Sequence, residues 1–113
     1  MTYDNAGLWS GETAHHSGFN WSTSTMNWWA NKVNKSKLLM GLPFYGISFT
    51  LQDQNQHGIG APISASDSQP YLTICLNVKN NGWTKVSDPD GPYAYKGYQW
   101  VGYDDCSQTT KYV

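Results

Sequence analysis

The chain lacks arginine, has a single glutamate and only two cysteines, and contains no long apolar segment. All seven of its basic side chains are lysines, so the planar guanidinium group, which binds phosphates through paired hydrogen bonds, is missing. Together with a net charge of −1, this argues against a nucleic-acid partner. No apolar run reaches the roughly 18 residues that a membrane span needs, and no signal peptide is visible. The composition favours an uncharged ligand.

Sequence patterns for metal and nucleotide sites are also missing. The three histidines do not show a spacing such as His-Glu-x-x-His, and the adjacent His15 and His16 would point in different directions on an extended segment. The glycines at positions 58 and 60 form too short a pattern for a phosphate-binding loop. We therefore expect no metal ion and no cofactor.

Aromatic residues, in contrast, are abundant. Six Trp, eight Tyr and three Phe make up 15% of a chain in which only 39% of the residues are apolar. One interpretation is that some of these rings face a ligand. The alternative is that they fill a core that is short of aliphatic side chains, since aromatic rings often dominate the energetics of a core.

The first half of the sequence predicts a strand, a helix and a second strand. Residues 1–4 have the pattern of the end of a buried strand, and residues 5–21 that of a loop. A helix is expected to follow an N-cap at Ser22 or Thr23. Residues 37–42 then form a short apolar run typical of a parallel strand that is covered on both faces.

Helical spacing predicts the face through which this helix packs. That face consists of Met26, Trp29 and Val33. Residues 51–97 interrupt the pattern with many Gly and Pro residues, and they are expected to form an antiparallel unit. Its predicted strands, and the strand that follows it, are residues 71–78, 83–86, 93–95 and 98–103.

Three motifs stand in a fixed order along the chain. They are Met1-Thr2-Tyr3-Asp4, Leu42-Pro43-Phe44-Tyr45-Gly46-Ile47-Ser48-Phe49-Thr50 and Gln99-Trp100-Val101-Gly102-Tyr103-Asp104-Asp105. Together they resemble the sixth, seventh and eighth barrel strands of a chitinase of glycoside hydrolase family 18. A complete eightfold β/α barrel needs roughly 250 residues, whereas this chain has 113. The resemblance therefore implies part of a catalytic domain.

The fold that the resemblance implies is of the α/β class. It is a partial (β/α)8 TIM barrel, with three C-terminal strands and one helix, that carries an inserted α+β antiparallel subdomain. Residues 1–50 would supply strand 6, helix 6 and strand 7, and residues 51–97 the chitinase insertion subdomain. Residues 98–113 would supply strand 8 and a tail.

The resemblance also assigns the site. Tyr3 and Asp4 would orient the 2-acetamido group of the substrate, whose carbonyl oxygen attacks the anomeric carbon in the substrate-assisted mechanism. Trp100 would form the floor beneath the sugar at the scissile bond. The complete set of substrate-binding positions that the resemblance implies is Met1, Trp9, Tyr45 and Trp100.

Two features depart from the family pattern. Ile47 stands where family members commonly have an arginine, so a polar contact in the cleft is expected to be lost. The acidic motif that ends in the catalytic glutamate has no counterpart, because the only glutamate is Glu12, in a loop. This chain alone is therefore expected to be inactive, and whether the parent protein is an enzyme stays open.

Three functions remain after this comparison of motifs. The first is part of a protein that binds and hydrolyses β-1,4-linked N-acetylglucosamine polymers with retention. The second is part of a chitinase-like lectin that binds chitooligosaccharide without cleaving it. The third is a truncated product whose aromatic residues only pack. The first two share chitin or a chitooligosaccharide as the partner.

Secretion is the expected localisation, chiefly because of the family resemblance. Two sequons, Asn20-Trp21-Ser22 and Asn34-Lys35-Ser36, would accept N-glycans in a secreted eukaryotic protein. Cys75 and Cys106 could be bonded to each other, free, or paired outside this chain. We expect no disulfide between them, because the family pattern does not clearly pair them.

Overall fold

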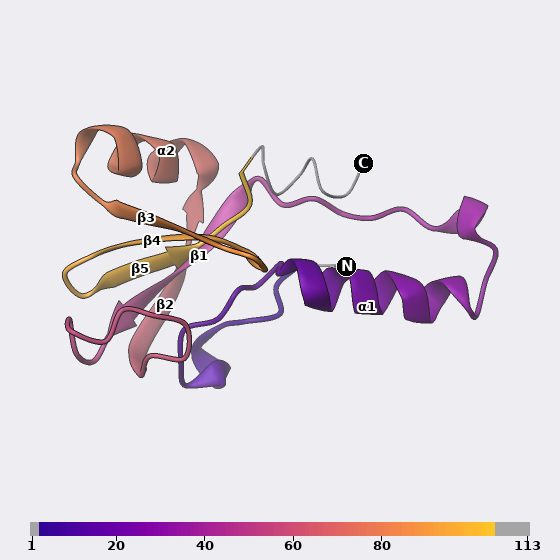
Figure 1. Cartoon of the computed structure of the whole chain (residues 1–113), viewed down its shortest axis with the longest axis horizontal. Coiled ribbons are helices and arrows are strands. Elements are labelled where there is room, and N and C mark those ends of the chain that lie inside the picture. Colours follow the sequence, from indigo (N-terminus) through magenta and orange to yellow (C-terminus); the bar gives the residue numbers. More distant parts are fainter. Residues whose placement is uncertain (1–2, 106–113) are drawn as a thin grey trace.

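The computed structural model describes residues 3–105. Its centre is one five-stranded sheet with the strand order β2-β1-β5-β4-β3 (Figure 1). Every strand pair in this part of the chain is antiparallel. The elements in chain order are η1 (Leu8–Ser10), α1 (Phe19–Ala30), η2 (Lys35–Lys37), β1 (Tyr45–Leu51), β2 (Ile63–Pro70), α2 (Tyr71–Asn80), β3 (Thr84–Asp88), β4 (Gly91–Lys96) and β5 (Gln99–Gly102).

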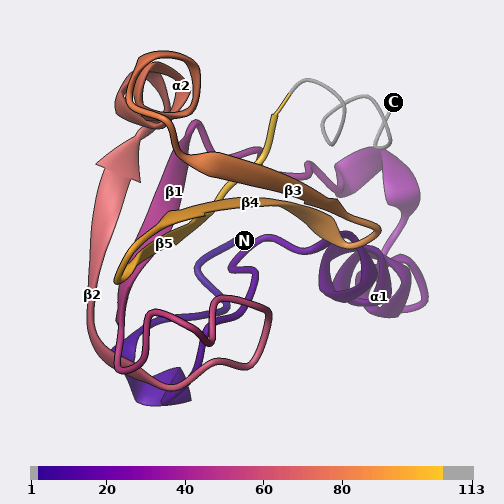
Figure 2. The same ribbon diagram turned by 60° about the vertical axis from the view of Figure 1, so that its left-hand side comes forward.

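The three central strands β1, β5 and β4 are buried on both faces, and successive side chains of a strand point to opposite sides. On one face, Trp100 of β5 packs with residues of β1 and β4 and with the N-terminal segment. On the other face, the adjacent Val101 packs with Ala94 of β4 and with Ile74 of α2. Figure 2 shows α2 on one side of the sheet and the N-terminal segment on the other.

Helix α1 begins at Phe19, and its N-cap is Gly18. The prediction of an N-cap at Ser22 or Thr23 was therefore wrong. The cause lies in the β3–β4 turn. The backbone N–H of Phe19 donates to the carbonyl oxygen of Asp90 at 2.8 Å, and the N–H of Asn20 donates to the Asp90 carboxylate at 2.5 Å. Asp90 thus satisfies amides that a helix leaves without intrahelical partners at its N-terminus.

The face through which α1 was predicted to pack is largely exposed within residues 3–105. The helix extends away from the sheet (Figure 1), and Trp29 is 46% exposed. Val33, beyond its C-terminal end, is also exposed. Ser22 is the one residue of α1 that is buried. The prediction that Met26, Trp29 and Val33 pack together against a core is therefore wrong for this part of the chain.

Residues 71–78 were expected to form a strand and instead belong to α2. Their β-branched and aromatic residues suit a strand, but Ile74 and Val78 are also four residues apart, which places them on one helix face. That face packs against Ala94 and Val101 on the sheet. Tertiary packing therefore overrides the local preference for a strand.

The predicted strand at residues 37–42 is also absent from the described part of the chain. Residues 35–37 form η2, and the segment that follows has no regular structure before β1 begins at Tyr45. Leu39 is 96% exposed. A strand needs a neighbour to pair its backbone groups, and no other strand of residues 3–105 lies against this segment. Tyr3 and Asp4 have no regular structure either.

The predicted strands at 83–86, 93–95 and 98–103 are confirmed as β3, β4 and β5 with shifted ends, whereas β2 was not predicted. The sheet thus takes strands from all three predicted units of the chain. The partial barrel and the boundaries of the insertion subdomain stay predictions. Within residues 3–105, none of the helices combines the length and the apolar character that crossing a bilayer requires.

Candidate functional site

Asp4 and Tyr45 lie 41 residues apart in the sequence and meet in the structure. Asp4 belongs to the irregular N-terminal segment, and Tyr45 is the first residue of β1. The Tyr45 hydroxyl donates a hydrogen bond to Oδ1 of Asp4. Tyr3 is close by, with its ring edge-on to the Tyr45 ring at a centroid distance of 6.2 Å. The structure therefore brings three of the predicted site residues together.

A buried histidine, which the sequence analysis did not select, holds this pair in place. His16 accepts a hydrogen bond at Nδ1 from the backbone N–H of Asp4 at 3.2 Å, and its carbonyl oxygen accepts from the N–H of Asn5 at 2.9 Å. Its ring stacks on Tyr45 with centroids 5.4 Å apart. His16 thus fixes both the backbone of Asp4 and the ring of Tyr45.

The protonation state of His16 follows from its contacts. Because an amide N–H donates to Nδ1, the ring proton sits on Nε2. Burial lowers the pKa of His16, against the attraction of the nearby Asp4 carboxylate. The imidazole is therefore neutral at pH 7, and the 3.9 Å approach of Nδ1 to Asp4 Oδ1 is a contact rather than an ion pair.

Asp4 has an unusual backbone conformation, with a φ of 61°. For a residue with a side chain, the left-handed region costs on the order of 1 kcal/mol. Such strain concentrates at functional sites, where the surrounding structure imposes it. Here two hydrogen bonds supply that constraint: the Asp4 backbone N–H donates to Nδ1 of His16, and the Tyr45 hydroxyl donates to the Asp4 carboxylate. The geometry presents the Asp4 carboxylate at the surface.

Tyr45 acts as a stable hydrogen-bond donor to this carboxylate. Burial raises the pKa of Tyr45 well above its usual range, and the hydrogen bond and negative charge of Asp4 raise it further. The phenol therefore keeps its proton throughout the physiological pH range. Since Oδ1 of Asp4 accepts the hydrogen bond from Tyr45, Oδ2 is the oxygen that a ligand would engage.

A pocket of about 340 Å³ opens beside Asp4. Trp9 lines it with a side chain that is 75% exposed, and Ile47 of β1 adds an apolar side chain to the lining. The wall that β2 supplies could not be found from the sequence, because no motif marks it. The full lining is Asp4, Ala6, Gly7, Trp9, Ile47, Ser66, Asp67 and Ser68.

Trp100 does not reach this pocket. Its side chain is 0% exposed, stacks on Tyr93 with centroids 5.0 Å apart, and donates from Nε1 to the carbonyl oxygen of His57 at 3.1 Å. No face of the indole is open to a sugar in this arrangement. Glu12 does not line the pocket either, and Met1 lies outside the described residues.

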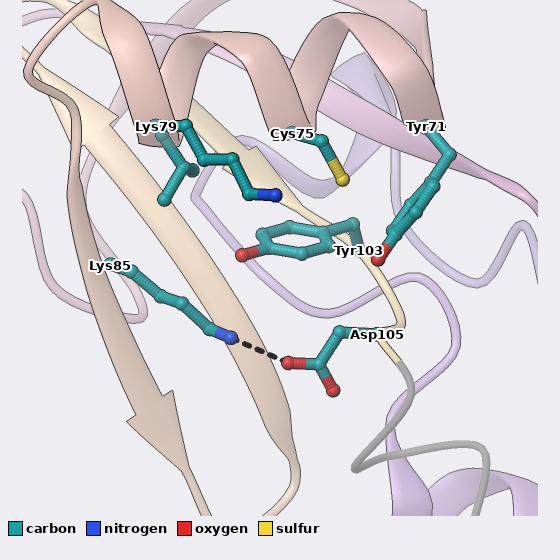
Figure 3. Close-up of a pocket in the computed structure, with 7 residues that line it drawn as sticks. Tyr71, Cys75, Lys79, Lys85, Tyr103 and Asp105 are labelled. Carbon is teal, nitrogen blue, oxygen red and sulfur yellow. Dashed lines mark hydrogen bonds and ion pairs between the residues drawn. The ribbon is translucent and has the colours of Figure 1, made fainter.

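A second, smaller pocket of about 160 Å³ lies between α2 and the sheet (Figure 3). Cys75, which carries a free thiol, lines it together with Tyr103. Lys85 and Asp105 form an ion pair of 2.6 Å at its edge. The absence of a bond between Cys75 and Cys106 stays a prediction, because Cys106 lies outside the described residues. No group of three metal-ligating side chains occurs within residues 3–105.

Asp104 is a buried acid whose charge state should control stability. Ser17 donates a hydrogen bond to it at 3.0 Å, which favours the ionised form. Burial outweighs this bond and raises the pKa of Asp104 to about 6. Because the pKa in the unfolded chain is about 3.9, the folded chain binds the extra proton. The contribution of Asp104 to stability is therefore greatest below pH 4 and declines as the pH rises to about 6.

We expect Asp104→Asn to raise the free energy of unfolding by about 1–3 kcal/mol at pH 7 and to leave it almost unchanged at pH 4, because the variant cannot ionise. Urea denaturation of both proteins at the two pH values measures this difference. The lowered pKa values of His15 and His16 change the stability of the parent and the variant equally, so they cancel in the difference between the two proteins. An equal effect at both pH values, or the same gain in the exposed control Asp53→Asn, would contradict the assignment.

Comparisons with known proteins agree on one family. The family model described as glycosyl hydrolases family 18 matches residues 1–113. An endochitinase of Manduca sexta is 37% identical over 136 residues, which cover 93% of this chain and 24% of the relative. An oviduct-specific glycoprotein of Ovis aries is 36% identical over 123 residues, covering 93% of this chain and 23% of the relative.

Solved structures give the same result. A class V chitinase from Nicotiana tobaccum, determined in complex with NAG4, superposes with a TM-score of 0.91 at 30% sequence identity. The match covers 100% of this chain and 38% of the tobacco chain. This chain therefore spans only 23–38% of the length of these three relatives.

Proposed function

The chain belongs to family 18 of the glycosyl hydrolases, and from this premise we propose that it is part of a chitinase-like protein whose Asp4 pocket holds the N-acetyl group of a chitooligosaccharide. The observation that carries this proposal is the convergence of Tyr45 and Tyr3 with Asp4, the acid that lines the pocket. The chitooligosaccharide in the tobacco relative supports the class of ligand.

The chemistry around Asp4 suits an acetamido group. Oδ2 of Asp4 can accept a hydrogen bond from the amide N–H, while Tyr45 holds the other carboxylate oxygen. Trp9 offers an exposed indole to the apolar face of a neighbouring sugar. If half of an indole surface of ~200 Å² is covered, its burial is worth on the order of 2 kcal/mol. Specificity comes from Asp4 and added affinity from Trp9.

In the whole protein, we propose hydrolysis of β-1,4-linked N-acetylglucosamine polymers by the substrate-assisted retaining route. There Tyr3 and Asp4 would orient the acetamido oxygen towards the anomeric carbon, and a general acid from outside this chain would protonate the leaving group. A chitinase-like lectin is the second candidate, because the acidic motif that ends in the family's catalytic glutamate is absent from this chain. The family premise also supports a partial barrel with an insertion subdomain, and secretion.

Binding of chitotriose tests the proposal. We expect the chain to bind with a dissociation constant in the millimolar range, about −4 kcal/mol, since only part of the cleft is present. Asp4→Asn should weaken binding by about 10- to 100-fold, the value of a hydrogen bond to a charged group. An NMR titration followed through the indole and backbone signals measures both constants.

The matched control is Asp53→Asn, since Asp53 is exposed and absent from the pocket lining. The control should bind like the parent chain. Asp4→Asn that folds normally and binds chitotriose as tightly as the control would show that the Asp4 carboxylate does not hold the sugar.

A further inference from the structure

The two sequons of this chain differ in structure, and we propose that Asn34 accepts an N-linked glycan in the folded protein whereas Asn20 does not. The proposal concerns the chain as an acceptor substrate and does not depend on chitin binding. An acceptor needs an exposed asparagine amide, and the serine or threonine two residues later must also be reachable by the transferring enzyme.

Asn34 meets both requirements. It lies in the exposed segment between α1 and η2 with an extended backbone, at φ −65° and ψ 132°. Its side-chain Oδ1 accepts a hydrogen bond from the backbone N–H of Ser36 at 3.1 Å, the geometry of an Asx turn. This bond uses the oxygen Oδ1 and not the nitrogen Nδ2, the atom to which a glycan would be attached. Ser36 is exposed on the same turn.

Asn20 fails the second requirement. It is the second residue of α1, and its own N–H is bonded to the Asp90 carboxylate. Ser22, the serine of this sequon, is 0% exposed, and its backbone N–H donates to the carbonyl oxygen of Gly18 at 3.0 Å. An enzyme could reach Ser22 only after the first turn of α1 unfolds.

The transfer itself is balanced without any redox change. The co-substrate is an oligosaccharide linked through its C1 oxygen to a lipid pyrophosphate. A bond forms between that C1 and Nδ2 of Asn34, the bond from C1 to the pyrophosphate oxygen breaks, and Nδ2 loses one proton to the solvent. The lipid pyrophosphate leaves. The oligosaccharide then extends from an asparagine that follows the end of α1, the helix that points away from the sheet (Figure 1).

The position of Asn34 also predicts that the glycan leaves the Asp4 pocket open. The pocket is lined by the N-terminal segment, β1 and β2, whereas Asn34 lies beyond the end of α1 that is farther from the sheet (Figure 1). The glycosylated chain should therefore bind ligands at that pocket as the unmodified chain does.

The test uses the folded 113-residue chain, a purified oligosaccharyltransferase and a lipid-pyrophosphate-linked oligosaccharide, with intact mass as the readout. We expect one glycan on the parent chain, one on the matched control Asn20→Gln, and none on Asn34→Gln or Ser36→Ala. In urea-unfolded chain, where α1 is lost, Asn20 should become a second acceptor. Peptide mapping identifies the modified asparagine.

Three results would overturn the proposal. They are a glycan on folded Asn34→Gln, two glycans on the folded parent chain, and no glycan on the folded parent when the unfolded chain is modified at Asn34. Circular dichroism of each variant confirms that it is folded before the reaction. Since both asparagines are exposed, neither substitution to glutamine should prevent folding.

Discussion

Trp100→Ala is expected to lower the free energy of unfolding by about 3–5 kcal/mol, the range for removing a fully buried large aromatic side chain. Trp100 is 0% exposed and packs with Phe49 and Tyr93. Its indole N–H also bonds to the carbonyl oxygen of His57, so truncation leaves both a cavity and an acceptor without its donor. Urea denaturation of the parent and variant at one pH measures the loss.

Trp29→Ala is the matched control, because it removes the same side chain from an exposed position on α1. This substitution should lower the free energy of unfolding by no more than about 0.5 kcal/mol, as for surface substitutions in general. Equal losses in the two variants would show that Trp100 does not anchor the core. A Trp100→Ala protein of parental stability that has lost chitotriose binding would instead support the role of Trp100 as a sugar platform.

This pair of tryptophans shows what the sequence could not predict. Helical spacing placed Trp29 on a packing face, but a face becomes buried only if another element lies against it. The motif containing Trp100 pointed to a sugar contact, yet the alternation of β5 turns Trp100 to one face of the sheet and Val101 to the other. Which of these faces meets solvent depends on segments far away in the sequence.

The elements were predicted where local and tertiary preferences agree. Strands β3 to β5 are bounded by glycine and proline residues and contain aromatic or β-branched residues, so their existence was predictable. Residues 71–78 carry the same composition but form α2, because Ile74 and Val78 then share the face that packs on the sheet. The segment at 37–42 is apolar without a strand partner among residues 3–105, so its pattern alone could not make a strand.

The site was predictable only in part. The motifs identified Tyr3, Asp4 and Tyr45 through a family resemblance, and the structure brings their side chains together. His16 could not be selected, because its roles as acceptor of the Asp4 amide and as stacking partner of Tyr45 arise from contacts across the fold. The same holds for the pocket wall at residues 66–68, which carries no motif and lies in a strand that was not predicted.

The second large effect concerns hydrolysis, which this chain alone is expected not to catalyse. General acid catalysis typically contributes about 10²–10⁴-fold to a rate, and the leaving oxygen of a glycoside needs a proton to depart. The only glutamate, Glu12, is exposed and does not line the Asp4 pocket. Asp4 is held by Tyr45 and His16 in a geometry suited to binding rather than to proton donation.

The measurement is the release of reducing ends from soluble chitooligosaccharide by the purified chain, with an intact chitinase as the positive control. The expected rate equals that of the buffer blank. Asp67 also lines the pocket, so it is the carboxylate that could substitute for the missing acid. Release above the blank that disappears in Asp67→Asn would overturn the prediction and make Asp67 the acid. Release that persists in Asp67→Asn and disappears in Asp4→Asn would assign proton donation to Asp4. Either result would also remove the reason for a lectin as the second candidate, since the chain would then contain its own catalytic acid.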